Sequence, residues 1–175
     1  MSNQALSRSP LFPPTQVLTN LNSGQLFFVK AAKGGGIIVC HPHHAEILGP
    51  GAAVGGMLDL DCRRLVPLGK VALTYPESYE QRRQSFLIRQ KWVGSAQKAI
   101  KHPVPLKRAY LMVMMLEKYF GCKAIAALSD EILASIAGVL PNTMAIARQQ
   151  RKQVQPAPQQ RKRQFPNQKK IALSV

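Results

Sequence analysis

The stretch over residues 128–151, LSDEILASIAGVLPNTMAIARQQR, constrains the fold of this 175-residue chain more than any other feature. Ala134 stands where two crossing helices must approach closely, and Gly138 supplies a sharp turn because glycine adopts positive φ at little cost. Pro141 suits the first position of a second helix, where its missing N–H is not needed. The inward-facing apolar positions are Leu133, Ile136, Met144 and Ala147. This pattern is typical of a helix-turn-helix.

The spacing of Ala134, Gly138, Thr143 and Met144 separates this stretch from an ordinary helical hairpin. Two helices of a small bundle, with no nucleic acid bound, remain the plain structural alternative. The charge favours a nucleic acid, because 24 Lys and Arg against 8 Asp and Glu give a formal net charge of +16. Such a field attracts DNA, RNA or an anionic membrane surface. No acidic residue follows Glu131, so the positive charge is concentrated behind the second helix. Double-stranded DNA is the partner that we expect.

The second helix and the basic segment behind it contain the expected DNA-contacting residues. These are Asn142, Thr143, Ala145, Arg148, Gln149, Arg151, Lys152, Arg161, Lys162 and Arg163. Asn and Gln side chains can bond adenine, and Arg can bond guanine or a phosphate. Thr143, near the helix start, suits a backbone phosphate. Because Ala145 and Ile146 offer only apolar contact, we expect modest sequence readout and an affinity that depends strongly on phosphate contacts.

The remaining chain predicts an α+β protein, with a small β-rich N-terminal domain, a connecting helix and a C-terminal helix-turn-helix domain. Short apolar runs separated by Gly, Pro or charged residues indicate strands: LFFVK, GGIIVC, HAEIL, RRLVPL and KVALTY. HPVP at 102–105 predicts a helix break. LKRAYLMVMMLEKYFG at 106–121 predicts a helix that is buried on several sides, with its methionines as core packing. The expected divisions are 1–22, a flexible segment; 23–79, β-rich; 80–104, the connecting helix; 105–153, helix-turn-helix; and 154–175, a basic tail.

An apolar stripe runs along the expected connecting helix. Phe86, Val93, Ala96 and Ile100 recur at helical spacing. The stripe is either the seam of a homodimer or the face that packs on the β-rich domain, and the sequence favours neither. A dimer would place two recognition helices one DNA turn apart, about 34 Å, on a palindromic site. Gly94 counts against a long uninterrupted seam, since glycine costs about 1 kcal/mol in a helix interior.

Two segments resemble the Crp/Fnr family of transcriptional regulators. ILGPGAAVGGMLDL at 47–60 is similar to the segment that caps the family's β-roll, and the C-terminal stretch up to residue 152 is similar to its DNA-binding domain. The resemblance implies a transcriptional regulator with an abridged β-roll, and RNA polymerase as a further candidate partner. Gly56 stands where cyclic-nucleotide binders carry a glutamate, and Arg63 and Arg64 are spaced differently from the phosphate-binding arginine. We therefore expect no dependence on a cyclic nucleotide and no cofactor.

The segment CHPHH at 40–44 is the sharpest competing motif. Cys40, His41, His43 and His44 contain the donor atoms that zinc or a softer transition metal prefers. Their spacing is poor, because alternate strand residues point to opposite faces and Pro42 disrupts the strand. Incidental surface histidines are the favoured interpretation, so no metal site is assigned, and metal sensing by the β-rich domain stays open. The glycine-rich runs lack a Lys-Ser/Thr ending and are interpreted as turns.

The sequence indicates neither an enzyme nor a membrane-spanning protein. The eight carboxylates are scattered without a Ser-His-Asp order, so we do not expect an enzyme. No run approaches the roughly 20 apolar residues of a membrane span. Three scattered cysteines indicate thiols in a reducing compartment, hence a cytoplasmic protein. The alternative to a transcriptional regulator is a basic RNA-, ribosome- or RNA-polymerase-associated protein. Aromatic residues make up only 6% of the chain, which counts against RNA stacking.

Overall fold

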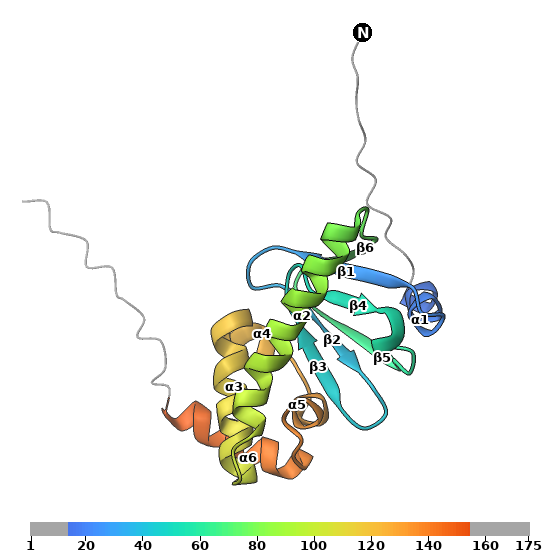
Figure 1. Ribbon diagram of the computed structural model, residues 1–175. Coiled ribbons are helices and arrows are strands. Elements are labelled where there is room, and N and C mark those ends of the chain that lie inside the picture. Colours follow the sequence, from blue (N-terminus) through green and yellow to red (C-terminus); the bar gives the residue numbers. More distant parts are fainter. Residues whose placement is uncertain (1–13, 155–175) are drawn as a thin grey trace, which may run out of the picture.

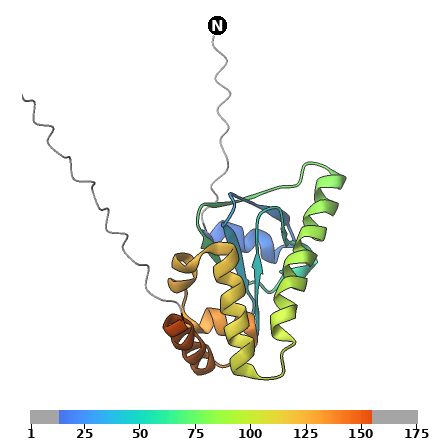
Figure 2. The same ribbon diagram turned by 90° about the vertical axis from the view of Figure 1, so that its left-hand side faces the viewer.

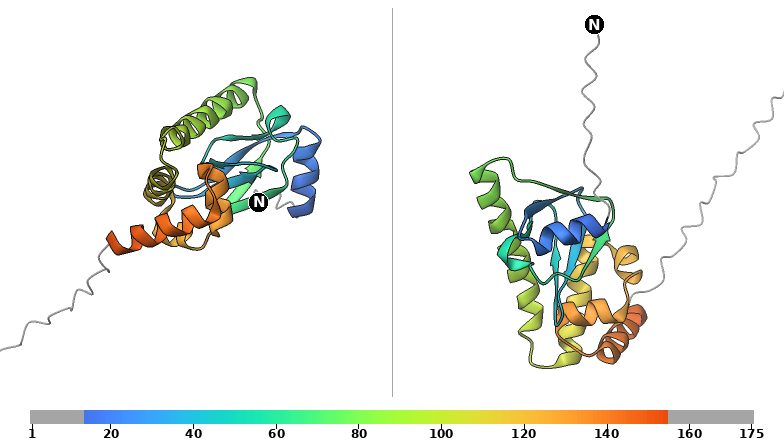
Figure 3. Two further views of the ribbon diagram at one scale, coloured as in Figure 1. Left: turned by 90° about the horizontal axis from the view of Figure 1, so that it is seen from below. Right: turned by 90° about the vertical axis from the view of Figure 1, so that its right-hand side faces the viewer.

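The computed structural model describes residues 14–154 and has the expected α+β architecture (Figure 1). Six strands form two small antiparallel sheets, and a helical region follows them in the chain. Helix α1 lies on one side of the strands, and the helical region lies on the other (Figures 1 and 3). Among residues 14–154, no helix is both long and apolar enough to cross a membrane.

The two sheets interleave along the sequence. The strands are β1 (Leu26–Ala31), β2 (Gly36–Cys40), β3 (Ala45–Leu48), β4 (Ala53–Gly55), β5 (Arg64–Leu68) and β6 (Val71–Thr74), with a short 3-10 turn η1 at Gly56–Leu58. One sheet has the order β4-β1-β6 and the other β3-β2-β5. In the β2–β3 hairpin, Val39 pairs with Glu46 and Cys40 with Ala45, so residues 41–44 form its tip. All five predicted strand runs are confirmed.

Strand β4 and helix α1 (Pro14–Asn22) were not predicted. The glycines around β4 indicated a turn, but Ala53 and Val54 between them are fully buried and pair with β1. The expected flexible segment 1–22 is wrong for its last nine residues. Val17, Leu18 and Leu21 form an apolar stripe at helical spacing that packs on the core of the sheets. Residues 1–13 lie outside the described part of the chain.

The helical region contains five helices within the described residues. They are α2 (Tyr79–Ile100), α3 (Pro105–Phe120), α4 (Cys122–Ala126), α5 (Asp130–Ala137) and α6 (Pro141–Val154). The predicted break at HPVP is confirmed, with Pro105 in the first turn of α3. Helix α3 is less enclosed than predicted. Met112 and Leu116 are fully buried, whereas Met114 and Tyr119 on its other side are exposed.

Helix α2 connects two hydrophobic cores, one centred on the sheets and one on the helices. Figure 2 shows this helix, in green, running along the strands and ending next to the start of α3. Trp92 packs against both cores, and its ring stacks obliquely on Phe120 of α3. Ala96 and Ile100 of the predicted apolar stripe pack against the helical core. Val93 lines a cavity of about 290 Å³ between α2, β3 and α5. Most of the stripe is therefore used within the chain, and Phe86 is the member that lies beside the exposed Tyr79 and Leu87.

Candidate nucleic-acid interface

The turn between α5 and α6 has the geometry that the sequence predicts. Gly138 ends α5 in the left-handed conformation, with φ 61° and ψ 46°, and its N–H donates to the carbonyl of Ala134. The N–H of Val139 donates to the same carbonyl at 3.1 Å. From α3, the Arg108 Nη2 donates to the carbonyl of Gly138 at 3.0 Å. These bonds occupy backbone groups that a helix end otherwise leaves without partners.

The facing sides of α5 and α6 are fully packed. The five side chains predicted to hold the pair together are all buried: Leu133, Ala134, Ile136, Met144 and Ala147. Ala137, which was not predicted, is buried with them. They belong to one core with Ala109, Met112 and Leu116 of α3. Helix α3 therefore forms the platform on which the helix pair rests. Because the inner side of α6 is occupied, only its outer side is available for a partner.

Arg148 lies on the inner flank of α6 and contacts the start of α5. Its Nη1 donates to Asp130 Oδ1 at 2.6 Å and to the carbonyl of Leu128 at 2.9 Å. Its Nη2 donates to the carbonyl of Ala126 at 3.0 Å. The side chain is only 16% exposed. The structure therefore places this predicted DNA contact within the fold, where it ties α6 to the segment between α4 and α5.

Arg151 is likewise engaged within the chain. Its Nε donates to Glu117 Oε2 of α3 at 3.0 Å, and its guanidinium lies 5.9 Å from the centre of the Tyr110 ring. The hydrogen bond to Glu117 raises the pKa of Arg151 above its usual range, and Tyr110 adds to the effect. These contacts fix the C-terminal half of α6 on α3.

The outer side of α6 is rich in amides. Asn142, Ala145, Gln149 and Lys152 are exposed and Thr143 is half-buried, so these five predicted contacts are accessible. Ile146, half exposed, lies among them. Gln150 and Gln153 are exposed as well. Sequence reasoning passed over these two glutamines, although their helical spacing from Asn142 and Gln149 would have placed them on this side.

The electrostatic potential favours an anion at two places, the beginning of α6 and the surface beside its end. The first turn of α6 contains no acidic residue, so the N-terminal pole of the helix is not neutralised locally. Lys107 of α3 lines a shallow hollow together with Gln150 and Gln153. An anion such as a DNA phosphate could approach both places. Lys107 was not predicted, because its position beside α6 depends on how α3 packs.

Three predicted contacts, Arg161, Lys162 and Arg163, lie outside the described residues.

No family model, curated protein or solved structure matches this chain. Its function therefore has to be inferred from the fold and from the geometry of the site.

Proposed function

We propose that this protein is a DNA-binding transcriptional regulator whose helix α6 enters the major groove. One observation carries the proposal. Helix α6 is packed on its whole inner side, joined to α5 through a left-handed glycine, and presents an exposed row of amides outward. A helix in the major groove needs such a rigid inner side and polar side chains that reach the base edges. Figure 3 shows the C-terminal end of α6 pointing away from the strands.

Because Arg148 and Arg151 are bonded within the chain, the DNA-contacting roles that we propose differ from those expected from the sequence. Asn142 and Gln149 are the candidate base readers, because each can bond the N6 and N7 of adenine. Arg148 and Arg151 keep α6 in position. Phosphate contacts come from Lys107, Lys152 and the basic residues 161–163. If six to ten phosphates are neutralised, affinity falls by roughly 10³- to 10⁵-fold between 50 and 200 mM salt.

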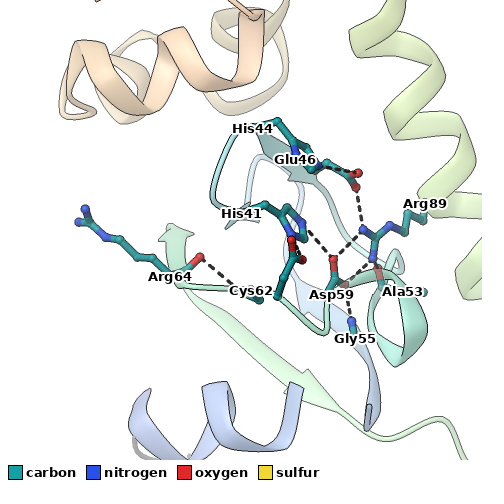
Figure 4. Close-up of polar contacts among 10 residues, drawn as sticks. His41, His44, Glu46, Ala53, Gly55, Asp59, Cys62, Arg64 and Arg89 are labelled. Atoms are coloured by element: carbon teal, nitrogen blue, oxygen red, sulfur yellow. Dashed lines mark hydrogen bonds and ion pairs between the residues drawn. The ribbon is translucent and has the colours of Figure 1, made fainter. Parts of the chain in front are cut away.

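We further propose a Crp/Fnr-type regulator that acts without a cyclic nucleotide. In the segment 47–60, which resembles the one that caps the family's β-roll, Gly56 lies in the 3-10 turn η1. Arg63 and Arg64, which follow this segment, are exposed. Arg64 points away from the cluster of buried charges (Figure 4). The buried arginine nearby, Arg89, is ion-paired with Asp59 at 2.6 Å and is not available to a phosphate. These contacts support action without a cyclic nucleotide.

A homodimer belongs to the same proposal, since a two-fold DNA site requires two copies of α6. Phe86, Tyr79 and Leu87 form an apolar surface of α2 that residues 14–154 leave uncovered, and we assign the dimer contact to it. Light scattering of the purified protein, alone and with its DNA site, measures the number of chains. RNA polymerase stays a candidate partner of the DNA-bound form.

The deciding experiment is selection of sheared genomic DNA on the purified protein at about 150 mM salt, where non-specific phosphate binding is weakened. Sequencing of the retained fragments should give a two-fold motif with half-sites about ten base pairs apart. Uniform recovery of all fragments would contradict a sequence-selective regulator. Tighter binding of total RNA than of the retained DNA would favour the RNA-associated alternative.

Substitutions on the outer side of α6 test the assignment of the base readers. Asn142→Ala and Gln149→Ala should each weaken binding to the selected site by about 5- to 150-fold, because a bidentate amide–adenine pair contributes about 1–3 kcal/mol of discrimination. Binding to random-sequence DNA should change little. Gln84→Ala, an exposed glutamine on α2 outside the hollow that Tyr79, Phe86 and Leu87 line, is the matched control. Fluorescence anisotropy on both DNAs measures the difference, and equal losses on the two would remove these residues from base readout.

A further inference from the structure

The tip of the β2–β3 hairpin brings two imidazoles and a carboxylate together. The backbone N–H of His41 donates to the carbonyl of His44 at 2.9 Å, and the two rings stack with centroids 4.4 Å apart. Glu46 follows two residues after His44 and therefore lies on the same side of the strand. One donor atom from each of these three residues lies within 4.8 Å of the other two. Figure 4 shows the group beside the buried Asp59 and Arg89.

The ring of His41 is oriented so that one nitrogen lacks a hydrogen-bond partner. Its Nδ1 lies 2.6 Å from Asp61 Oδ1, and since a carboxylate only accepts, Nδ1 carries the proton. In the neutral imidazole of this tautomer, Nε2 presents a lone pair. It is buried and makes no hydrogen bond with any of residues 14–154, and it lies 3.4 Å from Asp59 Oδ1. The side chain of His41 is only 2% exposed. An Nε2 lone pair that faces a carboxylate is unfavourable unless a proton or a metal cation lies between the two atoms.

The surrounding charges favour a cation. Asp59, Asp61 and Glu46 are three carboxylates, and Arg89 is the guanidinium that contacts two of them. Arg89 donates to both oxygens of Asp59, at 2.6 and 2.8 Å, and to Glu46 Oε2 at 2.7 Å. Glu46 Oε1 is turned instead toward His44 Nε2, 3.9 Å away. One guanidinium against three carboxylates leaves negative charge for a further cation to balance.

We propose that His41 Nε2, an imidazole nitrogen of His44 and Glu46 Oε1 bind a divalent transition-metal ion, with zinc as the test ion. Two imidazoles and a carboxylate form a donor set that suits zinc. The bond from Asp61 to His41 Nδ1 is the outer contact that orients a metal-binding histidine. Ligand atoms around tetrahedral zinc lie about 3.4 Å apart, as follows from bond lengths of about 2.0–2.1 Å. The 57% exposed side chain of His44 can close the remaining gap.

The site differs from the one that the CHPHH motif suggested. Cys40 packs against the helical core, and His43 is exposed and outside the group. Glu46 replaces them as a ligand. This metal site is a property of the β region and does not depend on the proposed DNA binding.

The test is zinc binding to the full chain, purified without a histidine tag and stripped of metal. Isothermal titration calorimetry with Zn²⁺ should give one ion per chain. Because His44 is exposed, His44→Ala should leave the fold intact, as circular dichroism can check, and should weaken zinc binding at least tenfold. Glu46→Gln should weaken it as well. His43→Ala, in the same hairpin, is the matched control and should bind zinc like the unaltered protein.

Cobalt identifies the donor atoms. Substituted Co²⁺ should show the visible bands of a nitrogen and oxygen environment without the near-ultraviolet band of a thiolate ligand. A thiolate band would place Cys40 in the site and overturn the assignment. The absence of zinc binding at micromolar concentrations, or equal affinities of His44→Ala and His43→Ala, would overturn the metal site itself and leave the DNA-binding proposal unaffected.

Discussion

The Arg148 side chain donates hydrogen bonds to two backbone carbonyls that precede α5 and to the side chain of the first residue of α5. Arg148→Ala leaves Asp130 and the carbonyls of Leu128 and Ala126 without these donors. Because the guanidinium is largely covered, we expect a loss of about 1–2 kcal/mol in the free energy of unfolding. Urea denaturation followed by circular dichroism measures the loss.

Gln149→Ala is the neighbouring control. Its side chain is exposed, so its free energy of unfolding should stay within about 0.5 kcal/mol of the unaltered protein. At a temperature where both variants are folded, Gln149→Ala should lose more affinity for the selected DNA than Arg148→Ala. The reverse order, with unchanged stability of Arg148→Ala, would mean that Arg148 leaves Asp130 to contact DNA.

The cysteines should differ in reactivity. Burial raises the pKa of the Cys62 thiol to about 11 and raises that of the half-buried Cys40, whereas Cys122 is exposed. Since the thiolate is the reactive form, iodoacetamide at pH 8 should modify Cys122 first. Mass spectrometry of the peptides measures the order, and Cys122→Ser should abolish the fast phase. Fast labelling of Cys62 in the folded protein would contradict its burial.

The shifted pKa of Cys62 also sets a pH range for stability. The neutral thiol is favoured in the folded protein, because the pKa rises from 9.0 to about 11 on folding. Its contribution to stability is therefore complete below pH 9 and is lost as the pH rises through 9 to about 11. Cys62→Ala should make the unfolding free energy less dependent on pH in that range.

At the scale of helices and turns, two glycines in open space should respond oppositely to the same substitution. Within residues 14–154, a Cβ on Gly138 or on Gly94 would meet no atom within 4 Å apart from its chain neighbours and its own helix backbone. Gly138 has a φ of 61°, a backbone conformation that alanine adopts only with strain. Gly138→Ala should therefore lower the free energy of unfolding by about 1–2 kcal/mol. Gly94 lies inside α2, where Gly94→Ala should raise the free energy of unfolding by about 0.5–1 kcal/mol. In thermal unfolding, the midpoint of Gly138→Ala should lie below that of the unaltered protein, and the midpoint of Gly94→Ala should lie above it.

A stability change that differs from the expected one at either glycine would contradict the role given to that glycine. If Gly138→Ala were neutral, the left-handed turn would not be required for joining α5 to α6. A destabilising Gly94→Ala would mean that α2 needs the glycine for a contact with another chain, as at a dimer interface.

Elements with a strong local pattern could be predicted from the sequence. The α5–α6 turn follows from Gly138 and Pro141, and the helix break follows from Pro103 and Pro105. Helix α1 and β4 were missed because nearby prolines and glycines outweighed short apolar stripes. Their stability comes from burial against β1 and the rest of the sheets, which a local pattern does not contain.

The site was predicted less completely, for the same reason. The position of α6 and its exposed amides followed from helical spacing. The engagement of Arg148 and Arg151 depends on Asp130 and Glu117, which lie 18 and 34 residues earlier in the chain. At the hairpin tip, Asp61 is 20 residues from His41. Such pairings are fixed by packing between elements, so composition and spacing could suggest the residue types but not their partners.

At the scale of the whole molecule, the distribution of charge divides the proposed DNA binding between two parts of the chain. Helix α6 presents amides with Lys152 beside them, and its two arginines are ion-paired within residues 14–154. Beyond residue 154 the sequence contains five basic and no acidic residues. We therefore expect α6 to supply preference among sequences and the basic tail to supply salt-dependent affinity.

Deletion of residues 155–175 separates these contributions, because it removes five of the sixteen net positive charges and none of the outer side of α6. Each phosphate contact adds about 0.9 to the slope of log affinity against log salt, so the slope should fall by at most about 4.5. Affinity at low salt should fall for every DNA, while the ratio of selected to random-sequence binding should stay the same. Anisotropy titrations from 50 to 200 mM salt measure both quantities. A reduced ratio with an unchanged slope would mean that the tail reads bases, and α6 would then lose its place as the principal reader.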